Sequence, residues 1–95
     1  MKQKSTGSEI AKIVGTSVSR GMEAMMKAQL ISAVIEAAQK KRLTHAEIAK
    51  RSKLPRSAVT GILSGSLQKI TIDRVLRLVE AVGLVAEIRI KNIAA

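Results

Sequence analysis

The chain has 95 residues and a formal net charge of +10, with one histidine, no cysteine and no aromatic residue. Its length suits one small domain with a modest core, and such domains often depend on a partner subunit. Without cysteine there is no disulfide framework or thiolate metal site, and without aromatic rings there are no stacking platforms for single-stranded nucleic acids.

The N-terminal part of the chain divides into an arm and a helix. Residues 1–21 are polar and rich in Gly, Ser and Thr, and we expect a flexible arm there. From about Met22 the apolar residues recur at helical steps, which predicts a first long helix that ends at a basic run, residues 40–42. The apolar positions are Met22, Met26, Leu30, Ile31, Val34 and Ala38. We expect the methionines to pack in the core or against a partner.

A short capped helix follows. Thr44, with Glu47 three residues later, is a capping box in which the hydroxyl accepts from the Glu47 amide and the carboxylate accepts from the Thr44 amide. The box predicts a helix over about 45–51. Ile48 and Ala49 are its inward candidates, and the small Ala49 permits a close crossing of two helices.

A turn and a second short helix come next. Residues 52–54 form the turn, and Pro55 sets φ for entry into a helix that extends to about Ser64. The inward positions of this helix are Val59, Ile62 and Leu63. The outward positions, which would read bases in a major groove, are Arg56, Ser57, Thr60, Gly61 and Ser64.

Positive charge is concentrated on this unit. Residues 40–56 contain seven lysines and arginines and a single acid, Glu47. Such a patch favours polyanions through counterion release, although a basic run can also be a solvated face. We expect phosphate contacts from its cations, from amides at the start of the first short helix and from the loop after the second. These residues are Arg42, Thr44, His45, Lys50, Lys53, Gly65, Ser66 and Lys69.

Two residues of the second short helix leave alternatives open. The guanidinium of Arg56 could pair with guanine in the major groove or clamp a phosphate near the helix start. Gly61 costs about 1 kcal/mol relative to alanine inside a helix, which indicates either a close approach to DNA or close packing within the protein.

The C-terminal part predicts one more helix and one strand. Thr71 caps a helix with Asp73 in its first turn and Gly83 just beyond its end. Its inward stripe is Ile72, Val75, Leu76, Val79 and Val82. Over residues 84–91 apolar and charged residues alternate, as in a half-buried strand whose inward side chains are Ala86, Ile88 and Ile90. A lone strand needs a partner, and pairing with the same strand of a second subunit would make a homodimer.

Residues 43–65, which follow the pattern LTxAExA and end in a glycine-bearing loop, resemble the XRE (lambda-repressor-like) helix-turn-helix family. The order of elements from about Gln29 to Lys91 is similar to that of small regulators of the HigA antitoxin type. This resemblance implies a mostly all-α bundle of four or five helices, over residues 22–91, with one C-terminal strand that pairs across a dimer. The chain departs from the family at Lys53, where glycine is usual, and at Ser52, where an apolar residue is usual.

These observations predict a cytoplasmic, sequence-specific regulator that binds double-stranded DNA as a dimer. The resemblance implies that it represses its own operon from an inverted-repeat operator, or that its main role is to neutralise a partner ribonuclease toxin. We expect no enzyme, because seven acids and one histidine form no paired carboxylates, triad or metal cluster at a useful spacing. No segment approaches the length of a membrane span, so we expect no membrane partner.

Overall fold

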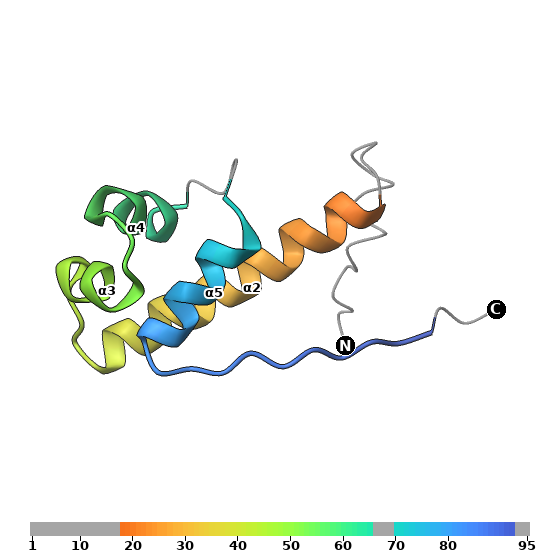
Figure 1. Ribbon diagram of the computed structural model, residues 1–95. Helices are drawn as coiled ribbons and strands as arrows, with labels where there is room; N and C mark the ends of the chain where they lie inside the picture. Colours follow the sequence, from red (N-terminus) through yellow and green to blue (C-terminus); the bar gives the residue numbers. More distant parts are fainter. Residues whose placement is uncertain (1–17, 66–69, 93–95) are drawn as a thin grey trace.

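Four α-helices follow one another in the computed structural model, which describes residues 18–65 and 70–92. They are α2 (Val18–Lys40), α3 (His45–Ser52), α4 (Arg56–Leu63) and α5 (Ile72–Ala81) (Figure 1). Within these described ranges there is no strand. The mostly all-α fold class is therefore confirmed.

The core draws side chains from all four helices. Helix α2 packs against α5 and α4, and α3 packs against both α4 and α5. Figure 1 shows α3 and α4 together at one side of the bundle, with α5 lying across α2. The largest fully buried side chains are Val34, Ile48, Val59, Val75, Leu78 and Val82. Each such aliphatic side chain stabilises the fold by about 1.5 to 3 kcal/mol when it leaves water, so the four helices are held by one shared core.

Helix α2 is longer than its apolar pattern predicted. It begins at Val18 rather than near Met22, so its first turn includes residues that we expected in the arm. Apolar periodicity marks only the part of a helix that packs, and residues 18–20 contain no helix breaker that would end it sooner. The core contribution of α2 starts at Ile31, while Met22 and Met26 are each 48% exposed. These two methionines are therefore not part of the core of the single chain. Of the two predicted roles, packing against a partner is the one that is still open.

The inward stripe of α5 also needs one correction. Val75 and Val79 are buried as predicted, but Leu76 is 43% exposed and Leu78 is fully buried. The buried positions 75, 78, 79 and 82 follow the i, i+3, i+4, i+7 spacing of one helix face, so the covered face of α5 is turned towards Leu78 and away from Leu76 relative to the predicted stripe.

Helices α2 and α5 end in the same way. Arg42 and Gly83 adopt the left-handed conformation, with φ of 53° and 81°. The following amides donate back five residues, from Leu43 to the Ala38 carbonyl and from Leu84 to the Val79 carbonyl. This is the hydrogen bond of a Schellman motif, so Gly83 acts as the C′ residue that the sequence predicted.

Two cations from other helices hold the C-terminal end of α5. The ammonium of Lys41 donates to the Val82 carbonyl, and the guanidinium of Arg51 donates to the Ala81 carbonyl at 3.4 Å. Positive charge at a helix C-terminus is favourable, because the carbonyls there carry partial negative charge. These contacts join the end of α2 and the end of α3 to α5.

The predicted strand does not form in the single chain. Residues 84–92 turn back at the end of α5 and run as an extended segment below α5 and α2 in Figure 1, with no ladder to any described residue. Ala86, Ile88 and Ile90 are all exposed, and Val85 is as well, so the expected half-buried alternation is wrong for the isolated subunit. A strand needs the backbone of a neighbour for its hydrogen bonds, and residues 18–65 and 70–83 offer none there.

We predict opposite effects for two glycine substitutions. A Cβ at position 83 would lie 2.6 Å from the Lys41 ammonium and would also strain a positive φ. Gly83→Ala should therefore lower the free energy of unfolding by about 1 to 2 kcal/mol. A Cβ at position 61 meets no atom within 4 Å, and Gly61→Ala should raise the free energy of unfolding by about 0.5 to 1 kcal/mol.

Urea unfolding of both variants at neutral pH would measure these changes. A more stable Gly83→Ala would contradict the assignment of Gly83 to the end of α5. A less stable Gly61→Ala would contradict the conclusion that Gly61 has free space inside α4.

Candidate nucleic-acid interface

The first helix of the helix-turn-helix, α3, starts at the predicted capping box. The Thr44 hydroxyl accepts from the Glu47 amide at 3.1 Å, and Glu47 Oε1 accepts from the Thr44 amide at 3.2 Å. The same hydroxyl also donates to Glu47 Oε1 at 3.1 Å. Thr44, which we expected at a phosphate, is therefore engaged in the cap on both its donor and acceptor sides.

Hydrogen bonding in this cap changes the acidity of Glu47. The Thr44 amide, and then its hydroxyl, stabilise the carboxylate and lower the pKa of Glu47 below its ordinary value. The ionised form is thus the one that holds the start of α3, with the carboxylate placed next to the positive end of the helix.

The turn between α3 and α4 contains both residues at which the chain departs from the resembling family. Ser52 is buried, but its hydroxyl donates to the Ala49 carbonyl at 3.3 Å and accepts from the Leu54 amide at 3.4 Å. A polar side chain is tolerated there because it is hydrogen-bonded. Lys53 has φ of 60°, a left-handed conformation that costs a non-glycine residue about 1 kcal/mol.

Helix α4 presents one face to the core and another to solvent. Val59 and Ile62 are buried, and Leu63 is half-buried. The exposed residues are Arg56, Ser57, Thr60 and Ser64, which are four of the five predicted base readers. The fifth, Gly61, has no described atom within 4 Å of an added Cβ. Close packing within the described chain is thus removed as the reason for glycine at this position.

Ser64 ends α4 through its side chain. Its hydroxyl lies 2.7 Å from the Thr60 carbonyl and 3.1 Å from the Gly61 carbonyl, and it donates to them. The proton that would meet a base is therefore directed into the helix, which leaves only the oxygen lone pairs for an outside donor.

A hydrogen bond that the sequence did not reveal connects the two helices. Nδ1 of His45, at the start of α3, lies 2.9 Å from Oγ1 of Thr60 on α4. The sequence assigned His45 to phosphates and Thr60 to bases, and the fold brings the two together. Periodicity reports the face of one helix only, so no sequence signal could have found a pair that depends on the angle between two helices.

The seven cations of residues 40–56 fall into two groups. Lys41 and Arg51 bind the end of α5, and Lys40 forms an exposed ion pair with Glu36 at 3.2 Å. The other four have exposed side chains and no ion pair with a described residue: Arg42, Lys50, Lys53 and Arg56. All four were predicted DNA contacts. Gly65, another predicted phosphate contact, is exposed with φ of 99°, whereas Ser66 and Lys69 lie outside the described residues.

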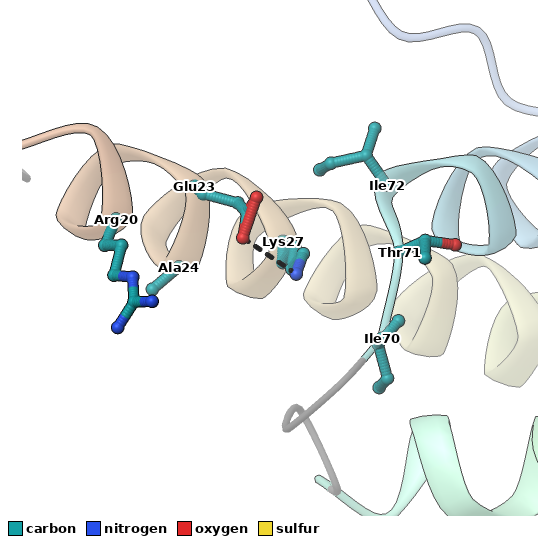
Figure 2. A pocket seen from close by; sticks show the side chains of 7 residues that line it. All are labelled: Arg20, Glu23, Ala24, Lys27, Ile70, Thr71 and Ile72. Atoms are coloured by element: carbon teal, nitrogen blue, oxygen red, sulfur yellow. Dashed lines mark hydrogen bonds and ion pairs between the residues drawn. The ribbon is translucent and has the colours of Figure 1, made fainter.

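A groove lies along α2, beside the segment that enters α5. Figure 2 shows this groove of about 620 Å³, where Ile70, Thr71 and Ile72 face Arg20 and Lys27. Lys27 is 9% exposed, and its ammonium forms an ion pair with Glu23 at 3.1 Å. The charge of this lysine is neutralised within α2, and we do not assign the groove to nucleic acid.

The comparisons place the chain in a family. A family model described as a helix-turn-helix domain matches residues 13–91, most of the chain. The chain belongs to this helix-turn-helix family. The XRE-like character expected from residues 43–65 agrees with this match, and a helix-turn-helix domain is a DNA-binding module. Comparison with curated proteins and with solved structures finds no significant match.

Residues 18–65 and 70–92 bring together no group of three or more His, Cys, Asp or Glu that could hold a metal ion. None of the described helices is long and apolar enough to cross a membrane.

We predict that the capping box stabilises the fold in a pH-dependent way. Because the folded-state pKa of Glu47 is lowered, its contribution is present above the unfolded-state pKa and is lost as the pH falls through the folded-state value. Glu47→Ala should therefore be less stable than the parent near neutral pH, with a difference that closes in acid. Thr44→Ala should lose about 1 kcal/mol at neutral pH.

Urea unfolding over a series of pH values would measure both variants. Glu80→Ala, which removes an exposed acid from α5, is the matched control. If Glu80→Ala showed the same pH-dependent difference, the effect would come from net charge and not from the cap.

Proposed function

We propose that this helix-turn-helix protein is a sequence-specific regulator that reads duplex DNA with the outer face of α4. The observation that carries the proposal is the set of exposed polar side chains on α4, supported by a capped α3 and accompanied by exposed cations that form no ion pair with a described residue. A helix of this kind fits a major groove, where base edges present distinct donors and acceptors.

The contacts divide into base-reading and phosphate-binding groups. Arg56, Ser57 and Thr60 lie on the exposed side of α4, and Arg56 can pair with both acceptors of a guanine. Arg42 after α2, Lys50 in α3 and Lys53 in the turn before α4 are exposed cations, and they would fix the protein on the phosphates without reading sequence. Gly61 would allow α4 to approach the DNA closely, since packing within the described chain does not require it.

We further propose that the protein acts as a dimer on an inverted repeat. In the extended segment, Val85, Ile88 and Ile90 are 79% to 90% exposed. Exposure of several large apolar side chains in one segment is unfavourable in water and is typical of a surface that a partner covers. Pairing of this segment with its copy would supply the missing strand hydrogen bonds about a two-fold axis. The two copies of α4 would then meet half-sites about 34 to 36 Å apart.

The simplest action of such a dimer is repression. Occupancy of a promoter by such a dimer would exclude polymerase from it. The resemblance to HigA-type regulators favours the promoter of its own operon. A regulator of this kind must be in the same compartment as the genomic DNA, and this requirement supports the cytoplasmic location expected from the sequence.

A second candidate function is neutralisation of a partner toxin. It is favoured by an apolar surface on α2 and α5, where Met22, Met26 and Leu76 are each nearly half exposed. A partner protein could cover this surface, and so could a second copy of the chain. A neighbouring reading frame for a small basic toxin would favour the antitoxin role.

The first test is binding to duplex DNA from immediately upstream of the gene, compared with a scrambled duplex at low and near-physiological salt. Nanomolar binding that prefers the upstream duplex and persists at the higher salt would support the regulator. Equal binding that salt abolishes for both duplexes would refute sequence-specific recognition and favour the partner-binding role.

We predict that two substitutions separate base reading from phosphate binding. Arg56→Ala should reduce discrimination at one base pair of each half-site by about 1 to 3 kcal/mol. Lys50→Ala should weaken binding to all duplexes alike and lower the salt slope by about 1. Titrations against a set of single-base operator variants at several salt concentrations would measure both effects. Uniform, sequence-independent losses from both variants would show that Arg56 is a phosphate contact.

We also predict that charge on the extended segment prevents dimer formation. Ile88→Glu and Ile90→Glu, combined, would place like charges on both copies of the paired segment and abolish its apolar contact. Sedimentation equilibrium should then report monomers, and affinity for a full inverted repeat should fall towards that for a half-site. Glu87→Gln is the control, because it neutralises a charge in the same segment. A dimer that survives the double substitution would refute the role of residues 84–91.

A further inference from the structure

The hydrogen bond between His45 and Thr60 lies at the junction of three helices. Nδ1 of the imidazole ring and Oγ1 of the threonine hydroxyl are 2.9 Å apart. His45 is half-buried, and together with Arg42 and Leu63 it lines a cavity of about 240 Å³. The imidazole therefore borders the same cavity as side chains from the end of α2 and the end of α4, whereas Thr60 is exposed on the outer face of α4.

A threonine inside a helix normally has a choice of side-chain conformation. Its χ1 angle divides between two rotamers, because the hydroxyl can bond to a carbonyl in the preceding turn of the helix. In this protein Oγ1 bonds instead to an imidazole on another helix. Holding Oγ1 at that position also determines where the Cγ2 methyl lies, since both groups are attached to the same Cβ.

We propose that His45 is a positioning residue for sequence recognition, which acts by fixing the side chain of Thr60. This inference rests on the proposed function, in which Thr60 faces a base pair in the major groove. A threonine meets a base pair with its hydroxyl at a hydrogen-bonding group or with its methyl at the thymine methyl. The rotamer selects which group is presented, so His45 determines the base preference without touching DNA.

This role differs from the phosphate contact that the sequence predicted for His45. A phosphate contact contributes affinity to every duplex and adds to the salt dependence of binding. A positioning residue changes the preference at one base pair and leaves the number of phosphate contacts unchanged. The two roles therefore predict different measurements on the same variant.

The DNA experiment compares the full chain with four single variants and with the double variant of His45→Ala and Thr60→Val, on a duplex library randomised within each half-site. His45→Ala removes the imidazole, and His45→Asn keeps a polar atom near the position of Nδ1. Thr60→Val keeps the branched shape but replaces the hydroxyl, and Lys50→Ala is the phosphate control. The salt slope is measured for each protein on its preferred duplex.

We expect His45→Ala and Thr60→Val to alter the preference at the same base pair, each by about three- to tenfold. The double variant should resemble either single variant, because both remove one interaction. His45→Asn should restore most of the preference, and the salt slope of His45→Ala should equal that of the parent. If His45→Ala instead weakened all duplexes alike and lowered the salt slope as Lys50→Ala does, the proposal would be wrong.

A second measurement needs no DNA. Three-bond couplings to the Thr60 methyl carbon report its χ1 distribution by NMR. We expect one rotamer in the parent and in His45→Asn, and an average of rotamers in His45→Ala. A single, unchanged rotamer in His45→Ala would overturn the proposal. If the parent chain showed no sequence preference at all, the proposed function would fail, and the rotamer measurement would still decide whether His45 positions Thr60.

Discussion

The fold depends on burial of one small apolar core that four helices share. Helices α3 and α4 have eight residues each, whereas an isolated helix in water needs about 12 to 15 residues to be even marginally stable. They are held because Ile48 and Val59 are fully buried in the same core cluster as Val34 and Leu78 from the longer elements. The capping box determines where α3 begins, but packing keeps it helical. The exposed face of α4 is therefore available for recognition only while its opposite face is buried.

Much of the positive charge around the helix-turn-helix stabilises the protein itself. Lys41 and Arg51 bind the carbonyls at the end of α5, so they fasten the last helix to α2 and α3. Their loss would disturb the framework that orients α4 before any phosphate contact was affected. Net charge alone would have counted them as DNA contacts, whereas the exposed cations that form no ion pair with a described residue are Arg42, Lys50, Lys53 and Arg56.

The apolar surface of the single chain continues from the helices onto the C-terminal segment. Met26 and Leu76 line one groove together with Ala86 and Ile88, so the unpaired segment and the exposed helix residues are neighbours. Removal of that surface from water would stabilise binding to a partner, and the partner could be a second copy of the chain or a different protein. The described chain therefore has two distinct surfaces, a polar basic one on α4 and an apolar one around Met26.

Local signals in the sequence determined the helical elements, the cap at Thr44, the C′ glycine at position 83 and the outward face of α4, because each depends on neighbours within a few residues along the chain. Only the tertiary structure decided that Leu78 is buried in place of Leu76, that the expected strand has no partner among the described residues, and that His45 meets Thr60. These features depend on the angles at which helices cross and on which surfaces face each other. Hydrophobic periodicity carries no information about such long-range geometry, since it records the face of each element separately.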